Sequence, residues 1–308
     1  MAGGPWYNLL PMKLNRRHFL TATGLGVGAL GWQASLPRWA AAAERRTFLV
    51  QPPAMHLGMV TYNLGQDWDV PTIIKNCEAA HFEGVELRTT HAHKVEVALS
   101  KDERREVKKR FADSKVQLFG LGSIFDYHTP DQAKLRKDIE DTKEYIVLAQ
   151  DVGATGVKVR PNGLPKEVPV EKTLAQIGHS LGELGAFARD HGLVIRLEVH
   201  GSGTAFPPHI KTILDAANHP SVGACWNCNA LDLDGEGWDH NFALLKDKIF
   251  SVHMVDLFQE EYPFRKLMAG LNQIPFHGFC LAEIPASTDP VRVMKYYRAL
   301  WLAYQGLL

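Results

Sequence analysis

The sequence predicts an α/β protein built as a (β/α)8 TIM barrel, a single domain that follows an N-terminal signal segment. Short apolar runs rich in β-branched residues alternate eight times with amphipathic stretches, which is the order of strands and helices around a parallel sheet. The part after the signal, residues 47–308, has the usual length of such a barrel. An open, doubly wound sheet is the rival, but no G-x-G-x-x-G sequence follows the first run.

Eight short runs are predicted to be the strands. Parallel strands covered on both faces are nearly continuous in apolar residues, and each run has this character apart from polar residues near its end. The runs span residues 56–62, 84–89, 116–124, 156–160, 194–200, 222–227, 250–255 and 279–284.

The stretches between these runs are predicted to be helices, because their apolar residues recur at intervals of three and four. Leu135 and Ile139 show this spacing in one stretch. Asp131 and Asp289 are expected N-caps, and Pro290 follows the second of them at the first helical position. The predicted helices span residues 70–81, 101–114, 131–152, 170–191, 208–218, 240–248, 263–271 and 290–304.

Residues 12–43 are typical of an export signal. A twin-arginine pattern, Asn-Arg-Arg-His-Phe-Leu, occupies residues 15–20, an apolar Gly/Ala-rich run follows at 20–36, and alanines at 40–43 offer a cleavage site. The alternative is a membrane anchor, but the run is weakly hydrophobic for a membrane span. We therefore expect residues 1–46 to direct export by the twin-arginine route to the periplasm or cell envelope. Membrane contact is expected only if the signal stays uncleaved.

Composition excludes several classes of protein. Lys and Arg together number 34, as do Asp and Glu, so the formal charge is zero. This balance argues against binding nucleic acid through bulk positive charge. With 45% hydrophobic residues the chain is not largely disordered, and its four cysteines are too few for a disulfide-built scaffold.

Polar residues gather at the predicted strand ends, where a barrel of this kind carries its active site. A charge buried without a partner is costly, so these residues are expected to pair with one another, with a metal or with a polar substrate. They are Glu86, Arg88, His91, His93, Asp126, Tyr127, His128, Lys158, Arg160, Arg196, Glu198, His200, Asn227, Asn229, His253, Asp256 and Glu283.

Four of these residues form a candidate metal site. Two carboxylates, one amide and one imidazole come from four consecutive strands, and this mixture suits one divalent ion, Mn²⁺, Mg²⁺ or Co²⁺, with Zn²⁺ also compatible. The set is Glu198, Asn227, His253 and Glu283.

The alternative for these charges is a buried network of salt bridges. Glu198 with Lys158 is one such pair, and Glu86 with Arg196 is another. Because Glu86 and Arg196 lie deeper in their strands, we expect them to pair with each other rather than to take part in catalysis.

Four segments carry a resemblance to a known family. They are Arg-Leu-Glu-Val-His-Gly at 196–201, Cys-Trp-Asn-Cys-Asn at 225–229, Val-His-Met-Val-Asp at 252–256 and Leu-Ala-Glu-Ile at 281–284. In this order on successive strands they resemble the xylose isomerase-like TIM-barrel superfamily, and within it the sugar phosphate isomerase/epimerase-type proteins. The resemblance extends over the whole chain after the signal.

The resemblance implies a divalent metal held by Glu198, position 227, His253 and Glu283. It also implies that Glu198 and Glu283 are catalytic and move protons on opposite faces of a substrate carbon, next to a metal-bound carbonyl or enediolate. The chain departs from the family at two positions. Asn227 stands where the epimerases commonly have Asp, which should weaken metal binding, and Ala230 replaces a histidine.

The remaining strand-end residues are expected to bind a small-molecule carbohydrate. They form a polar, cation-rich set that fits a multiply hydroxylated sugar or a sugar acid: Arg88, His91, His93, His128, Lys158, Arg160, His200, Asn229 and Asp256. Three functions fit this site. The first is a metal-dependent sugar isomerase or epimerase, the second a metal-dependent 3-keto-glycoside lyase acting by β-elimination, and the third a non-catalytic exported sugar-binding barrel. Residues 258–264 are a candidate lid or subunit contact of a homo-oligomer.

Overall fold

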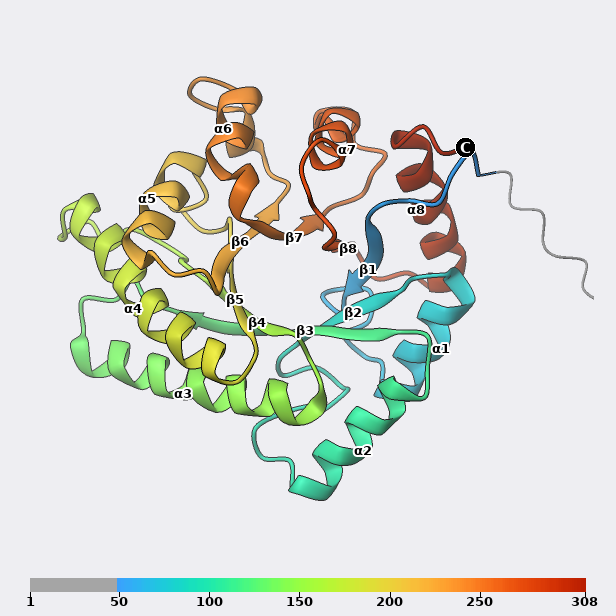
Figure 1. Ribbon diagram of the computed structural model, residues 1–308, viewed down its shortest axis with the longest axis horizontal. Helices are drawn as coiled ribbons and strands as arrows, with labels where there is room; N and C mark the ends of the chain where they lie inside the picture. Colours follow the sequence, from blue (N-terminus) through green and yellow to red (C-terminus); the bar gives the residue numbers. More distant parts are fainter. Residues whose placement is uncertain (1–48) are drawn as a thin grey trace, which may run out of the picture. The chain divides into compact units, whose positions relative to one another are not determined.

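The computed structural model describes residues 49–308, and within them the predicted (β/α)8 barrel is confirmed (Figure 1). Eight parallel strands follow one another around a closed barrel in sequence order, and β1 closes the ring by pairing with β8. The predicted export signal, and the boundary at residues 46 and 47, lie outside the described residues. None of the helices within residues 49–308 is long and apolar enough to cross a membrane.

The strands lie where the apolar runs predict them, with ends that differ by a few residues. They are β1 (His56–Val60), β2 (Gly84–Arg88), β3 (Gln117–Asp126), β4 (Gly156–Arg160), β5 (Val194–Glu198), β6 (Val222–Asn227), β7 (Ile249–Met254) and β8 (Phe279–Ala282).

The helices surround the barrel and begin at recognisable caps. The Asp131 carboxylate accepts from Ala133 N at 2.9 Å, as expected of an N-cap, whereas Asp289 makes no side-chain cap hydrogen bond. The helices are α1 (Val70–Ala80), α2 (Lys101–Ala112), α3 (Gln132–Val152), α4 (Val170–Asp190), α5 (Pro207–Ala217), α6 (Trp238–Leu245), α7 (Phe264–Asn272) and α8 (Pro290–Tyr304), with short 3-10 turns η1 (Ala230–Leu233) and η2 (Lys246–Lys248).

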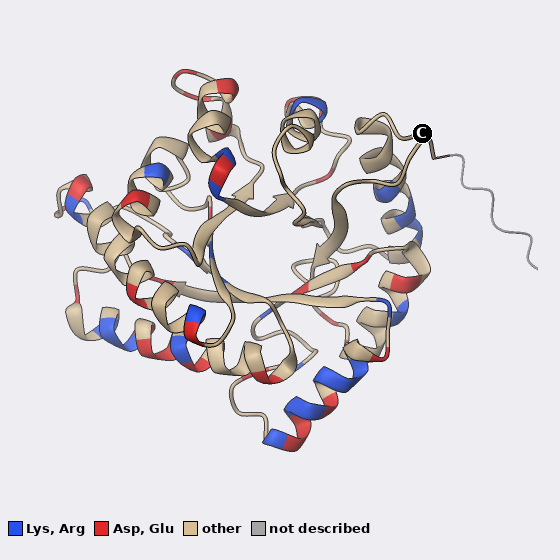
Figure 2. Cartoon of the chain, viewed as in Figure 1, with Lys and Arg blue, Asp and Glu red and all other residues tan. Residues whose placement is uncertain are grey.

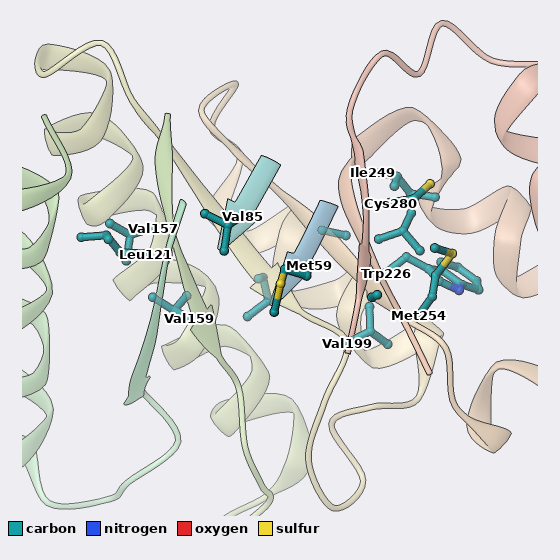
Figure 3. Close-up of a cluster of buried hydrophobic side chains, with 14 of the residues drawn as sticks. Met59, Val85, Leu121, Val157, Val159, Val199, Trp226, Ile249, Met254 and Cys280 are labelled. Carbon is teal, nitrogen blue, oxygen red and sulfur yellow. The ribbon is translucent and has the colours of Figure 1, made fainter. Parts of the chain in front are cut away.

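The main apolar core lies between the sheet and the helices. Alternate strand residues point outward into it, as the period of two in a strand requires. Figure 3 shows ten of these buried side chains: Met59, Val85, Leu121, Val157, Val159, Val199, Trp226, Ile249, Met254 and Cys280. A separate cluster of Val60, Phe119, Phe279 and Leu281 is also buried.

Charges of both signs are interspersed on the outer helices, most visibly on α2 and α3 (Figure 2). Many of them form ion pairs one turn apart, such as Arg110 with Glu106 at 2.8 Å. Mixed surface charge of this kind accounts for the neutral balance of the composition and leaves the polar interior of the barrel as the exceptional region.

Candidate active site

Three predicted metal ligands meet inside the carboxyl end of the barrel. Glu198 is the last residue of β5, His253 lies in β7, and Glu283 follows β8 with its backbone N–H bonded to Met254 O at 2.8 Å. One ligand atom from each of the three side chains lies within 4.8 Å of the others. His253 Nδ1 is 3.4 Å from Glu198 Oε1 and 3.5 Å from Glu283 Oε2.

Asn227 stands beside this trio. Asn227 is the register partner of His253 in the sheet, and its side-chain Nδ2 lies 3.3 Å from Glu198 Oε1. Because an amide presents oxygen and nitrogen in nearly the same shape, a half-turn would place Oδ1 at the same point. The structure thus brings all four predicted ligands together, and we call Glu198, Asn227, His253 and Glu283 the ligand group.

The ligand group fits a divalent cation on two counts. The Nδ1 atom of His253, which faces Glu198 and Glu283, is buried and has no hydrogen-bond partner in the described part of the chain, which is costly unless a ligand takes it up. Three carboxylates, Glu86, Glu198 and Glu283, also lie within 3.5 Å of the ring nitrogens of His253. Carboxylate oxygens converging on an imidazole nitrogen are donors that suit such an ion.

Glu198 divides its two carboxylate oxygens between two neighbours. Oε2 accepts from Lys158 Nζ at 2.7 Å, so the predicted salt bridge is confirmed, while Oε1 faces His253. Burial alone would raise the pKa of Glu198, but the charges of Lys158 and His253 hold that pKa well below its ordinary value. The salt bridge and the metal site are therefore compatible, because each uses a different oxygen.

Glu86 lies behind His253 and does not pair with Arg196, so that expectation is wrong. Its Oε1 is 3.4 Å from His253 Nε2. Arg196 instead donates to Thr155 Oγ1 at 2.7 Å and lies over the Phe119 ring, 3.8 Å from its centroid.

Glycines in β3 make room for both of these side chains. A Cβ at Gly122 would lie 2.7 Å from Glu86 Oε1, and one at Gly120 would lie 3.1 Å from Arg196 Nη1. A carboxylate that holds the far nitrogen of a metal-binding histidine is a common arrangement, and Glu86 is placed for that role.

A pocket of about 130 Å³ opens above the ligand group. Its lining is Val60, Tyr62, Arg88, Lys158, Arg160, Glu198, His200 and Glu283. Four predicted substrate-binding residues are thus present together with the two predicted catalytic glutamates. Tyr62 was not predicted as a site residue, although its place at the end of the first predicted strand run, 56–62, is the signal that could have found it.

Other predicted substrate residues are engaged elsewhere. Both ring nitrogens of His93 bond to backbone, Nε2 to Arg88 O at 2.7 Å and Nδ1 to Val95 N at 3.0 Å. His91 contacts Thr61 Oγ1 at 3.0 Å, and burial together with the charge of Arg88 lowers the pKa of His91 to about 4. Neither residue lines the pocket.

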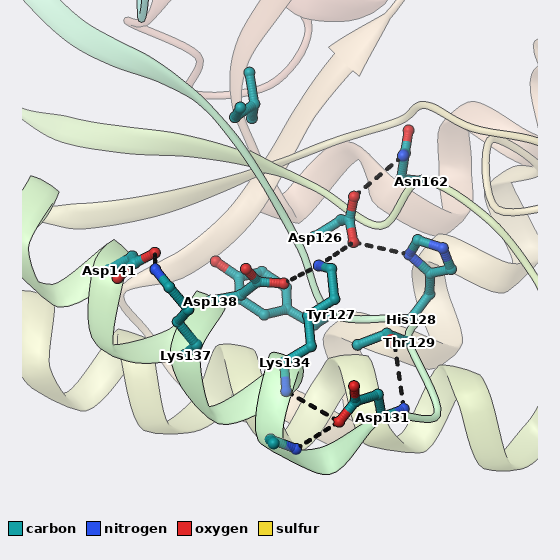
Figure 4. Close-up of polar contacts among 12 residues, drawn as sticks. Asp126, Tyr127, His128, Thr129, Asp131, Lys134, Lys137, Asp138, Asp141 and Asn162 are labelled. Carbon is teal, nitrogen blue, oxygen red and sulfur yellow. Dashed lines mark hydrogen bonds and ion pairs between the residues drawn. The ribbon is translucent and has the colours of Figure 1, made fainter.

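His128 and Asp256 also lie outside the pocket lining. Figure 4 shows the Asp126 carboxylate between His128 Nδ1, at 3.1 Å, and the amide of Asn162, also at 3.1 Å. Asp256 borders a separate apolar groove with Phe258 and Tyr296, next to α8.

Asn229 belongs to a buried polar network beside the ligand group. Its Nδ2 donates to Asn227 O at 2.6 Å, and its side-chain oxygen caps η1 at Leu231 N. The buried Asp232 accepts from Asn229 N at 3.2 Å and from Tyr262 Oη at 2.6 Å. Burial raises the pKa of Asp232 to about 7. This network ties the segment after β6 to the segment after β7.

The family model described as xylose isomerase-like TIM barrel matches residues 74–302. No curated protein sequence matched the chain.

Solved structures of the same fold include several sugar epimerases. The 3-keto-D-glucoside 4-epimerase YcjR from E. coli is 13% identical with a TM-score of 0.68, covering 81% of this chain and 99% of that one. An L-ribulose 3-epimerase is 15% identical with a TM-score of 0.70, covering 82% and 95%. The IOLI protein with a bound zinc atom is 17% identical with a TM-score of 0.67, covering 81% and 99%.

Proposed function

This chain belongs to the xylose isomerase-like TIM barrel family, and from that premise we propose that it is a divalent-metal-dependent sugar isomerase or epimerase. The reaction would move a proton at a carbon next to a carbonyl group. One observation carries the proposal: Glu198 and Glu283 both contact Nδ1 of the buried His253 and both line one polar pocket. The sugar epimerases among the structures of the same fold support it.

The ligand group would hold the ion, with Mn²⁺, Mg²⁺ or Co²⁺ as candidates and Zn²⁺ compatible as well. When bound, the cation supplies Lewis acidity, which stabilises negative charge that develops on an oxygen beside the reacting carbon. Glu86 would orient His253 by holding its Nε2.

The protein's own groups would carry the proton. Glu198 is ionised, because Lys158 holds one of its oxygens, and it can take a proton from a carbon placed above it. Glu283 also lines the pocket, next to a different strand from that of Glu198, and would return a proton to the opposite face of the substrate carbon. The contact with Lys158 fixes the direction of the Glu198 carboxylate.

The proposal is tested by metal content and by isotope exchange on purified protein. We expect about one divalent ion per chain, lost in the Glu198→Gln/Glu283→Gln double variant and retained in the control Glu183→Gln, which alters an outer-helix carboxylate. In D₂O, epimerised ketoses and 3-keto-glucosides should carry deuterium at the inverted carbon. Full metal retention by the double variant would refute the ligand group.

The same NMR experiment separates the alternatives. If the product is unsaturated and an aglycone is released, the protein is a lyase and the proposed isomerase or epimerase function is wrong. If sugars raise the melting temperature of the protein but are not converted, the protein is a non-catalytic sugar-binding protein.

We also propose that residues 15–20 direct export by the twin-arginine route. Replacing both arginines there by lysine should leave the protein in the cytoplasmic fraction. Unchanged export of that variant would reject the proposal.

A further inference from the structure

Two arginines line the pocket without a carboxylate partner. Arg88 Nη1 donates to Thr89 O at 2.8 Å and to Thr90 Oγ1 at 2.7 Å, and Arg160 Nη2 donates to Ile124 O at 3.0 Å. Within residues 49–308 neither guanidinium forms an ion pair. Neutral oxygens therefore hold both side chains in place without cancelling their charge. We call Arg88 and Arg160 the arginine pair.

The acid best placed to neutralise Arg160 is turned away from it. Asp126 is the register partner of Arg160 in the sheet. Its carboxylate instead contacts Asn162 and His128, as Figure 4 shows. The Nε of Arg160 is buried and has no hydrogen-bond partner in the described part of the chain. A half-buried cation in this state lacks both its counter-charge and one hydrogen bond.

Charge is distributed unevenly around the pocket. Arg88 and Lys158 are both register partners of Gly122 in β3, which places them on neighbouring sides of one strand. The arginine pair lies on the β2–β4 side, whereas Glu198 and Glu283 come from β5 and the end of β8. Glu198 already neutralises Lys158.

A bound divalent ion would give the pocket a net positive charge. The carboxylates of Glu86, Glu198 and Glu283 equal in number the cations of Lys158 and the arginine pair. The ion that the ligand group fits would then leave the pocket with net positive charge. A ligand with a negative group of its own, placed opposite the ligand group, would restore neutrality.

We propose that the substrate is a sugar acid, a monosaccharide whose carboxylate binds to the arginine pair while its carbonyl end faces Glu198 and Glu283. The planar guanidinium fork matches a carboxylate in two-point contact. Phosphate in barrels of this fold is usually held near the loops after the seventh and eighth strands, whereas the arginine pair follows β2 and β4. This inference rests on the proposed function, whose site it completes.

The test measures binding rather than turnover. Metal-loaded full-length protein is titrated calorimetrically with matched sugars that differ only in the carboxylate: glucuronate against glucose, galacturonate against galactose and mannuronate against mannose. We expect at least one acid to bind about tenfold or more tightly than its neutral partner, with a preference that declines as salt rises. If no acid exceeds its neutral partner, the proposal is overturned.

Variants locate the effect. Arg88→Gln and Arg160→Gln should each lower affinity for the preferred acid about tenfold, and lower affinity for its neutral partner by less, so that the acid preference shrinks. Arg160→Lys, which keeps the charge but loses the fork, should lose less than Arg160→Gln. The exposed Arg265 on α7 provides the control Arg265→Gln, and melting curves confirm that each variant is folded.

Two further results would overturn the proposal. One is an acid preference that survives in the Arg88→Gln/Arg160→Gln double variant. The other is tighter binding of glucose 6-phosphate than of every acid, which would assign the arginine pair to phosphate. Loss of acid preference with intact metal binding and deuterium exchange leaves the proposed function standing. Acid preference without any deuterium exchange refutes the proposed function alone.

Discussion

The pair formed by Lys158 and Glu198 allows a quantitative prediction about the Lys158→Met variant. The two side chains are 7% and 4% exposed and lie 2.7 Å apart. At that separation and an effective dielectric of about 20, their attraction is about 6 kcal/mol, partly offset by the cost of desolvating both charges. Methionine fills similar space but leaves Glu198 buried without its counter-charge. We expect metal-free protein to lose about 3–5 kcal/mol of unfolding free energy.

Metal should recover part of this loss. A divalent ion bound to the other oxygen of Glu198 supplies the positive charge that the variant lacks, and it no longer meets the repulsion of the Lys158 ammonium. The difference between the losses measured with chelator and with saturating Mn²⁺ equals the gain in metal-binding free energy. We expect about tenfold tighter binding in the variant, or about 1.4 kcal/mol.

Urea unfolding with and without Mn²⁺ measures both quantities. The control is Lys143→Met, whose lysine is 21% exposed and pairs with Glu183 on the outer helices. This control should lose at most about 1 kcal/mol, equally in both conditions. An equal loss for Lys158→Met with and without metal would show that no cation binds next to Glu198.

Three other changes test neighbouring parts of the site. Glu86→Gln removes the carboxylate behind His253 and should weaken metal binding about 10–100-fold in a metal titration, with an unshifted affinity arguing against that role. Asn227→Asp adds a negative charge to the ligand group and should tighten metal binding; the same affinity in both proteins would remove Asn227 from the group. Asp232→Asn should change the pH dependence of stability. The pKa of Asp232 is raised from 3.8 to about 7 in the folded protein, so its favourable contribution is complete below 3.8 and is lost as pH rises through 7. Relative to the parent, the variant should therefore gain up to roughly 4 kcal/mol between pH 4 and pH 8 in urea unfolding, and parallel pH profiles would contradict this.

The fold could be predicted because periodicity and element order are local signals. Eight apolar runs alternating with amphipathic stretches leave few other ways to bury a sheet, and the strand ends then meet at one rim. Strand period also placed Glu198 on the inner face.

Partner choice inside the barrel could not be read in the same way. Glu86 and Arg196 were each correctly expected to be buried, but their partners depend on the stagger of the strands and on the space left by Gly120 and Gly122. Sequence spacing carries neither quantity. His93 illustrates a different limit of prediction from sequence. It follows a strand end, as a substrate-binding residue would, but both of its ring nitrogens are hydrogen-bonded to nearby backbone groups and are not available to a ligand.

The residues proposed to bind the ion lie on or next to the hydrogen-bonded strands of the barrel. Glu283, which follows β8, is hydrogen-bonded to β7 through its backbone amide. A frame of that stiffness sets the spacing of the donors before any ion arrives, so little ordering accompanies its capture. Metal-free and metal-loaded protein should therefore share one backbone. The loops that follow the strands can then be exchanged to change which sugar is recognised, while the ligand group keeps its geometry.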